Sequence, residues 1–382
     1  NYVDNLRGIA ILLVVITHIS DVTRHYKDTL QVLTDYGQMG VQLFFVASAF
    51  TLCLSAGRRA GEDRAWTRFY LRRFFRIAPL YYSGILLYLL FCSTVRPWLE
   101  GAPAALATPY TWKNILANVL LVHDFYPGQA NNKVVPGGWS IGTETTFYLI
   151  FPLIYLLYRR VRHSDALLVL IPASALLAGY LFLPLAERLL DYPIKNNTFL
   201  YFHLYCQLPV FLMGMSLYFK LERLQHAGRS TLLFSAAAFV LLLAGSIYLF
   251  TYRPDLTYLF PSSAGLAFLF LFLLYRELPF LSNRYIGRLG TISYSVYLLH
   301  FMFAWDGTRF LFRHLHPAVS RELLFLAGFS LTMVLTIPLA LFTEKYIEKP
   351  GIAFGNKIIR RLKKRKPRMI QPALPEPLKE SA

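Results

Sequence analysis

Residues 1–21 read NYVDNLRGIAILLVVITHISD, an apolar run long enough to enter a lipid bilayer. The run carries an arginine near its start, Arg7, and a histidine inside it, His18. Both side chains fall on one face of a helix, roughly 16 Å apart along its axis. An ionisable residue inside a membrane helix is costly and indicates a functional site. A snorkelling arginine and a hydrogen-bonded histidine would explain the pair as well.

The composition is that of a membrane protein. Of the 382 residues, 55% are hydrophobic and 16% are charged, which is too few charges for a soluble protein of this size. Apolar segments of spanning length recur along the chain and predict an all-α, polytopic helical bundle in the membrane. The net charge of +18 does not indicate nucleic-acid binding, because the excess lies in particular loops and in the tail. The cysteines show neither disulfide nor metal-site spacing, so we expect no metal.

We expect about ten transmembrane helices. The candidate segments are 7–24, 37–56, 77–95, 139–158, 165–185, 200–219, 231–251, 257–276, 289–310 and 323–347. The segment 112–126 is shorter and holds polar residues such as His123 and Asp124, which predicts an interfacial or re-entrant piece.

The distribution of Lys and Arg predicts the orientation. With the N-terminus in the cytoplasm, the arginine-rich loops and the basic tail all lie inside, as the positive-inside rule requires. We therefore expect a multi-pass protein of the cell membrane with both termini cytoplasmic. A membrane domain, 1–350, would precede a basic, proline-rich, disordered tail, 351–382. The outer loop 311–322 fits least well, because it carries Arg313 and Arg321.

A cluster of arginines lies in RFYLRRFFRIAPLYY, residues 68–82. Arg73 and Arg76 share a helix face, and the spacing predicts that Arg72 stacks over Arg76. The cluster fits an ordinary cytoplasmic anchor, or a clamp for phosphates, which guanidinium groups bind through two hydrogen bonds. Arg7 lies at the same predicted face, so all four arginines could hold one anionic ligand.

Two further stretches carry polar residues into apolar spans. In PGGWSIGTETTFYLIFP, residues 136–152, Glu144 is either an acid favoured by the helix dipole or a carboxylate in a polar cavity. In the cavity it would pair with an arginine or act as an acid or base. In LGTISYSVYLLHF, residues 289–301, the polar stripe of Ser293, Tyr297 and His300 would hold helices together or face a shared cavity.

Taken together, these stretches resemble acyltransferase family 3, a family of integral-membrane acyltransferases. The resemblance covers roughly residues 2–350. It rests on Arg7 and His18, on GVQLFFVASAF (40–50), on Phe69, Arg72, Arg73, Arg76, Pro79 and Tyr81, on Trp139, Ser140, Glu144, Phe147, Tyr148 and Pro152, on Gly290, Ser293, Tyr294, Ser295, Tyr297 and His300, and on Glu348 and Pro350. Ala49 replaces a glycine usual in the family, a change that touches packing more than chemistry.

The resemblance implies transfer of an acyl group, usually acetyl, from cytoplasmic acyl-CoA to a hydroxyl of an extracytoplasmic or lipid-linked cell-surface glycan. Acetyl-CoA would be the donor, with its phosphates held by Arg73 and Arg76, and by Arg7 and Arg72. His18 would act as general base or transient acyl carrier, and Glu144 would orient the acceptor or hold an arginine. The supporting residues would be Trp139, Ser140, Tyr148, Ser293, Tyr297 and His300. Many relatives carry an appended extracytoplasmic hydrolase-like domain, which we do not find in this chain.

Two other classes of protein remain open. Intramembrane histidines and arginines also mark the substrate and proton paths of transporters and flippases. A purely structural membrane protein is the third reading. The arginine cluster in phase with Arg7 favours the acyltransferase, because a CoA site needs it and a generic carrier does not.

Overall fold

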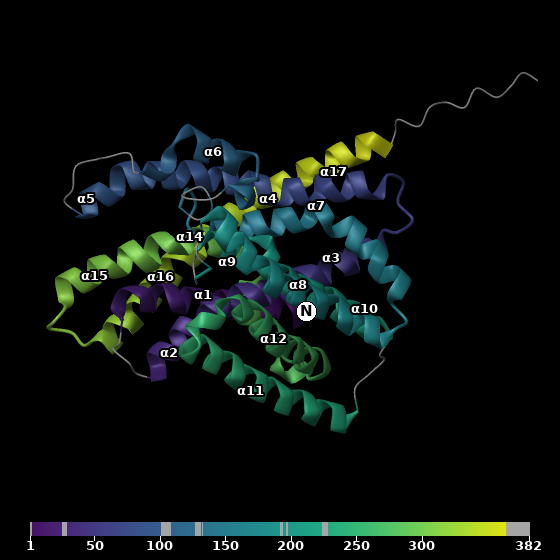
Figure 1. Ribbon diagram of the computed structural model, residues 1–382. Coiled ribbons are helices and arrows are strands. Elements are labelled where there is room, and N and C mark those ends of the chain that lie inside the picture. The colour runs from purple at the N-terminus through teal and green to yellow at the C-terminus, as the bar shows by residue number, and fades with distance from the viewer. Residues whose placement is uncertain are drawn as a thin grey trace, which may run out of the picture.

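The computed structural model describes residues 2–24, 29–100, 108–126, 131, 133–191, 194–195, 198–223 and 228–363. These residues form helices joined by short turns, and none of them forms a strand (Figure 1). The long helices are α1 (Tyr2–Thr23), α3 (Gly40–Arg58), α4 (Ala65–Leu90), α7 (Gly138–Val161), α8 (Asp165–Leu190), α10 (Leu204–Arg223), α11 (Arg229–Tyr252), α12 (Phe260–Glu277), α16 (Arg321–Thr343) and α17 (Lys349–Lys363).

Shorter helices connect or extend these. They are α2 (Thr29–Tyr36), α5 (Arg96–Glu100), α6 (Trp112–Val119), α9 (Phe199–Phe202), α13 (Arg284–Thr291), α14 (Ser293–Phe301) and α15 (Thr308–Leu315). The 3₁₀-helical turns are η1 (Gly37–Met39), η3 (Thr108–Tyr110), η4 (His123–Phe125), η5 (Pro254–Leu259) and η6 (Pro279–Leu281). The π-helical turns are η2 (Phe91–Val95), η7 (Met302–Gly307) and η8 (Glu344–Glu348).

The predicted class, an all-α polytopic membrane protein, is confirmed. Within the described residues, nine helical stretches are long and apolar enough to cross a membrane. The remaining predicted span, 289–310, differs from them. Its helix breaks at Ile292, and α14 then continues through the π-helical turn η7 into α15. This run contains Asp306 and Arg309, which make it more polar than the other nine.

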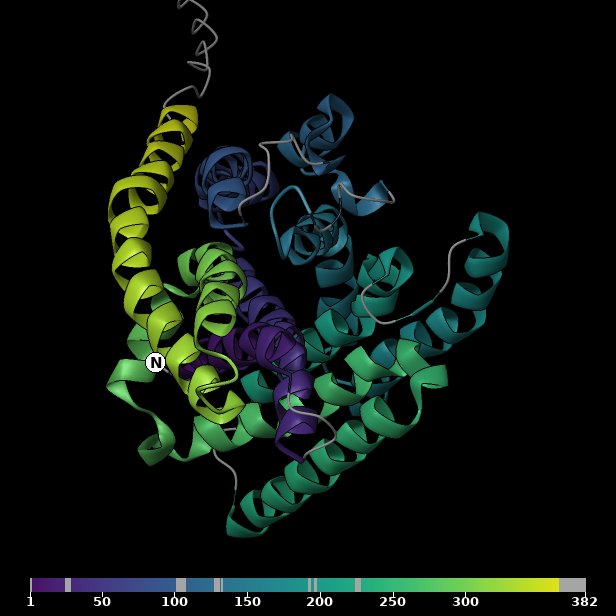
Figure 2. The same cartoon turned by 90° about the vertical axis from the view of Figure 1, so that its left-hand side faces the viewer.

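Helix α1 lies near the centre of the bundle (Figure 2). It packs against α3, α12, α13, α14, α15 and α16, so elements from both halves of the chain contact it. The contact with α13 is backbone to backbone. A Cβ atom on Gly290 would lie 1.7 Å from the carbonyl oxygen of Asp4, and one on Gly8 would lie 2.1 Å from that of Ile286. Glycine at both positions therefore allows α13 to fix the start of α1.

The prediction that the tail is disordered from residue 351 is wrong for residues 351–363, which are helical. Glu348 and Pro350 do not end the helix, because η8 leads directly from α16 into α17. A π-helical turn next to a proline accommodates the ring and the missing N–H without ending the helix. Helix α17 then packs along α4, with Gly351 against Pro79 (Figures 1 and 2). Residues 364–382 of the predicted tail lie outside the described residues.

The segment 112–126 forms only α6 and η4, which are far too short to span, as predicted. Its polar residues are buried and hold it against the bundle. The Tyr81 hydroxyl donates to Asn118 Oδ1 (2.6 Å), and His123 Nε2 donates to the carbonyl of Gly138 (2.9 Å). These bonds fix the start of α7, the helix that carries Glu144.

Candidate functional site

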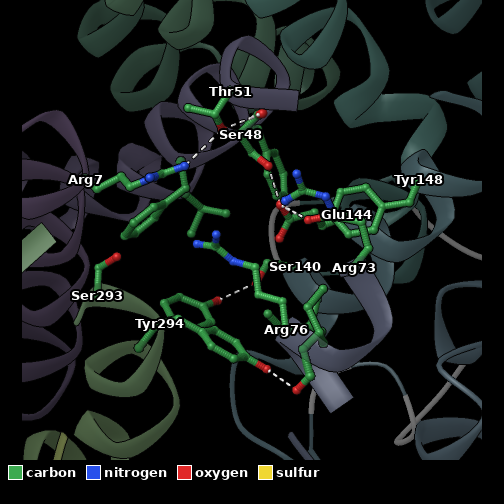
Figure 3. A pocket seen from close by; sticks show the side chains of 16 residues that line it. Arg7, Ser48, Thr51, Arg73, Arg76, Ser140, Glu144, Tyr148, Ser293 and Tyr294 are labelled. Atoms are coloured by element: carbon green, nitrogen blue, oxygen red, sulfur yellow. Dashed lines mark hydrogen bonds between the residues drawn. The ribbon is translucent and has the colours of Figure 1, made fainter. Parts of the chain in front are cut away.

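Helices α1, α3, α4, α7 and α14 enclose one polar cavity, which we call the arginine cavity. With its mouth it holds about 740 Å³ of empty space. Figure 3 shows Arg7 pointing into it from α1, Arg73 and Arg76 from α4, and Glu144 from α7. The other lining residues are Val41, Phe44, Phe45, Ser48, Thr51, Ile77, Ser140, Ile141, Tyr148, Ser293, Tyr294 and Tyr297.

Arg7 is held in place from two sides. Its Nη2 atom donates to Thr51 Oγ1 at 3.0 Å, and its Nη1 atom lies 3.5 Å from Asp4 Oδ1. The Arg7 side chain is 19% exposed, so the bond to Thr51 satisfies one of its donors away from bulk water. This geometry presents the guanidinium to the cavity rather than to the membrane surface.

Arg73 and Arg76 have no carboxylate within ion-pair distance among the described residues. The Arg73 guanidinium lies over the rings of Phe69 and Tyr148, 5.6 and 5.7 Å from their centroids. Its buried Nε atom has no hydrogen-bond partner in the described structure. The lining carries three guanidinium groups, Arg7, Arg73 and Arg76, against one carboxylate, Glu144, so its net charge is positive.

Glu144 lines the cavity, but hydroxyl groups hold it rather than an arginine. Its Oε1 atom accepts hydrogen bonds from Ser48 Oγ and, at 2.7 Å, from the Tyr148 hydroxyl (Figure 3). None of the described arginines forms an ion pair with it. The ion pair with an arginine, which was one of the alternatives for Glu144, is therefore not present among the described residues. The Glu144 carboxylate holds Tyr148, whose ring lies beneath the Arg73 guanidinium.

Arg72 does not join this cavity, and the prediction that it stacks over Arg76 is wrong. Its Nη1 atom lies 2.9 Å from Glu62 Oε2, in an adjacent pocket that Trp66 and Arg159 also line. One residue along a helix rotates the side chain by about 100°, so Arg72 and Arg73 point in different directions. Trp139 does not line the cavity either. It stacks on Phe202, with ring centroids 4.4 Å apart.

The polar residues predicted to form one stripe on α14, Ser293, Tyr297 and His300, contact two different sites. Ser293 and Tyr297 line the arginine cavity, and Ser140 Oγ donates to the Tyr297 hydroxyl at 2.9 Å. His300 instead faces His18, with ring centroids 5.5 Å apart. The two intramembrane histidines thus lie side by side, outside the arginine cavity.

Hydrogen bonds define the tautomers of both histidines. His18 Nδ1 lies 3.1 Å from Asp21 Oδ2, and since an ionised carboxylate only accepts, Nδ1 carries the proton. His300 Nδ1 lies 2.8 Å from the carbonyl of Tyr297 and is protonated for the same reason. In the neutral rings, each Nε2 is then an acceptor. The His18 side chain is 21% exposed, and the rings of His300, Phe301 and Trp305 surround it.

Aromatic rings separate His18 from the arginine cavity. The lining of the cavity ends at Tyr297, whose ring centroid is 6.2 Å from that of Phe301. The Phe301 ring in turn is 4.5 Å from His18. Arg7 and His18 therefore share a face of α1, as predicted, but they open onto different spaces.

Several residues at these sites escaped the sequence analysis. Ser48 and Thr51 contact Glu144 and Arg7, and their three-residue spacing inside an apolar run was the available signal. Asp21 follows His18 by three residues, the spacing at which helix neighbours meet. Tyr294, which carries the resemblance but was given no role, also lines the cavity. Ala49, in contrast, is buried against Gly214 of α10, so the departure from glycine concerns packing.

Comparisons with known proteins agree with this description. A family model described as an acyltransferase domain, Acyl_transf_3, matches residues 1–344. A membrane-bound transacylase, BcsY of Komagataeibacter xylinus, is 25% identical over 374 residues, which are 93% of this chain and 83% of the relative.

A second relative matches over a shorter stretch. Acyltransferase MdmB of Streptomyces mycarofaciens is 29% identical over 169 residues, or 41% of this chain. The aligned stretch spans 39% of that relative's length. No solved structure matches significantly.

Proposed function

This chain belongs to the acyltransferase family whose model matches residues 1–344, and from that premise we propose which groups it transfers. The donor would be acetyl-CoA from the cytoplasm. The acceptor would be a hydroxyl of an extracytoplasmic or lipid-linked cell-surface glycan. The protein would act in the cytoplasmic membrane. The membrane setting is supported by the nine apolar helical stretches and by the similarity to a membrane-bound transacylase.

The proposed donor site rests on Arg73 and Arg76, which line the same cavity. Neither guanidinium has a carboxylate partner among the described residues, and Arg7 faces them across the same cavity. Coenzyme A carries its phosphates at one end of a long, thin arm, so three converging arginines would hold that end. The arm would then extend along α1 toward His18, over the roughly 16 Å that separate Arg7 from His18.

The chemistry would take place at His18 Nε2. That atom would remove the proton from the acceptor hydroxyl while the hydroxyl oxygen attacks the thioester carbonyl carbon. A carbon–oxygen bond forms and the carbon–sulfur bond breaks. The thiolate of coenzyme A then takes the proton from the imidazolium. Asp21 would hold Nδ1–H and stabilise the imidazolium, as a carboxylate does beside a catalytic histidine.

Acylation of His18 itself is the other route, in which the imidazole carries the acyl group between donor and acceptor. We favour the general-base route, because it needs one ternary complex. In either route the rings of Tyr297 and Phe301 must move, since they close the direct path from the arginine cavity to His18.

We assign Glu144 to the donor side. It lines the arginine cavity and holds the Tyr148 hydroxyl, and His18 does not line that cavity. Glu144 would therefore shape the binding site of the phosphates and take no direct part in proton transfer. The remaining lining residues, Ser140, Ser293 and Tyr297, would contact the arm of the donor.

A transporter or flippase is the rival function, because the cavity and the histidines lie one after the other along α1. An acyltransferase releases the free thiol of coenzyme A, and a transporter does not. Purified protein would be given acetyl-CoA and extracted cell-envelope glycans, and free thiol would be measured together with the mass of the glycans. We expect thiol release that depends on the glycan and an added acetyl group. A transporter would release no thiol, and that result would reject our proposal.

A further inference from the structure

A second polar pocket lies at the end of α1 opposite the arginine cavity, near the loop after α15. We call it the α15 pocket. It is lined by Arg24, Arg309, Arg313, Asp21, Trp305 and Phe312. Three arginines and one aspartate give its lining a net positive charge. The residues come from the end of α1, from η7 and from α15.

This pocket adjoins the proposed catalytic imidazole. Asp21, which lines the pocket, bonds His18 Nδ1 at 3.1 Å. Trp305, which also lines it, has its ring centroid 5.3 Å from that of His18. A molecule seated in the α15 pocket would thus lie next to His18, on the side away from the arginine cavity.

Two of the three arginines of the pocket have no ion-pair partner among the described residues. Arg309 lies 3.5 Å from Asp306, but that carboxylate already accepts two bonds from Arg96, at 2.8 and 3.1 Å. Neither Arg24 nor Arg313 forms an ion pair with any described carboxylate. The one acid in the lining, Asp21, is engaged with His18. The pocket therefore attracts a negative group.

Membrane topology does not explain these arginines. They lie at the end of the bundle that the positive-inside rule assigns to the outside, where arginine is disfavoured. A ligand would explain why the chain keeps arginines there. The aromatic rings of Trp305 and Phe312 are the apolar surface that usually accompanies charged groups in a binding site for a small molecule.

We propose that the α15 pocket is the acceptor subsite and that the acceptor is anionic. Its phosphate or carboxylate group would be bound by Arg309, Arg313 and Arg24, with the hydroxyl to be acylated placed against His18 Nε2. The inference rests on the proposed function, because it takes His18 as the group that meets the acceptor. It adds the chemical class of that acceptor.

The test is a calorimetric titration of the purified full-length protein. Coenzyme A is titrated first and kept at saturation, so that the arginine cavity cannot take up the second ligand. Glucose 1-phosphate, glucuronate and glucose are then titrated separately. We expect the phosphate sugar, the carboxylate sugar or both to bind, and glucose to bind at least tenfold more weakly. Equal binding of all three sugars, or binding of none, would overturn the proposal.

Variants locate the binding. We expect Arg309→Gln combined with Arg313→Gln to weaken binding of the anionic sugar at least tenfold and to leave coenzyme A binding unchanged. The matched control is Arg188→Gln, which removes an exposed arginine at the end of α8, outside the α15 pocket, and should change neither affinity. If the double variant binds the anionic sugar as the wild type does, the pocket is not its site.

A lipid headgroup is the other source of a phosphate. The titrations are therefore repeated in nanodiscs of phosphatidylcholine with and without phosphatidylglycerol. Binding of the anionic sugar that is unaffected by phosphatidylglycerol supports the acceptor subsite. Binding that phosphatidylglycerol abolishes would overturn it in favour of a lipid site. Failure of coenzyme A to bind contradicts the proposed donor site. The double variant Arg309→Gln and Arg313→Gln then decides separately whether the anionic sugar binds in the α15 pocket.

Discussion

Arg72 and Arg73 are neighbours in the sequence and have different surroundings. Arg72 is neutralised by Glu62 at 2.9 Å. Arg73 lies over two aromatic rings with a buried Nε that has no partner in the described structure. A guanidinium of this kind is available to a ligand, whereas one that is already paired is not.

Replacing Arg73 by lysine should therefore weaken coenzyme A binding by at least about tenfold, or ~1.4 kcal/mol. Lysine keeps the charge but loses the planar fork and the stacking on Phe69 and Tyr148. The matched control is Arg72→Lys, which should change the dissociation constant by less than about threefold, as surface ion pairs contribute little. Equilibrium binding of radiolabelled coenzyme A measures both. Equal losses in the two variants would contradict the assignment.

Residue type and spacing were enough to predict that Arg7, Arg73 and Arg76 could share one site, and these three residues line one cavity. They were not enough for Arg72 or Trp139, because the azimuth of a side chain on its helix depends on which neighbour the helix packs against. Ser48 and Thr51 were missed because hydroxyl residues are common in membrane helices. Their role follows only from the proximity of α3 to α1 and α7.

At the scale of helices, the approach of α13 to α1 positions the arginine cavity. Gly290 of α13 lies against the backbone of Asp4, one turn before Arg7. A carbonyl oxygen in a helix cannot move aside as a flexible side chain can. The separation of the two helices is therefore set by the absence of a side chain.

Gly290→Ala should destabilise the protein by about 1–3 kcal/mol or more, as overpacking does, and should displace Arg7. We expect a lower apparent melting temperature in detergent and weaker coenzyme A binding. Gly245→Ala is the control, because no atom lies within 4 Å of the added methyl group. It should be neutral or stabilising by up to about 1 kcal/mol, the gain of alanine over glycine in a helix. An unchanged melting temperature for Gly290→Ala would contradict the close contact.

The helices predicted best were those that length and apolarity define. The π-helical turns η7 and η8 were not foreseen, since they depend on local backbone geometry rather than on hydropathy. For that reason the predicted membrane domain ends at residue 350, although α17 continues to Lys363 along α4. Charge and proline content suggested an irregular tail, and packing against a neighbouring helix outweighed them over residues 351–363.

At the scale of the whole molecule, two positively charged sites lie at opposite ends of the bundle. The arginine cavity adjoins the start of α4, and the α15 pocket adjoins the loop after α15. His18, Phe301 and Tyr297 lie between them. Donor and acceptor would enter from opposite sides of the membrane and meet at His18.

This arrangement predicts which loops face the cytoplasm. Cysteines would be introduced singly by Gly61→Cys and Ala318→Cys, both at exposed positions in turns, in a Cys92→Ser background because Cys53 and Cys206 are buried. In intact cells, a membrane-impermeant maleimide should label position 318 and should label position 61 only after lysis. The reverse pattern would place the arginine cavity outside and remove cytoplasmic acetyl-CoA as its ligand.

The most direct test of the central claim compares wild type with His18→Ala and Arg73→Ala, each confirmed as folded and inserted. Coenzyme A binding and acetyl transfer to cell-envelope glycans are measured for all three. We predict that Arg73→Ala loses donor binding, while His18→Ala binds the donor normally and transfers nothing. If the wild type binds no coenzyme A, or if His18→Ala transfers acetyl groups at the wild-type rate, the division between an arginine donor site and a histidine catalytic site is wrong.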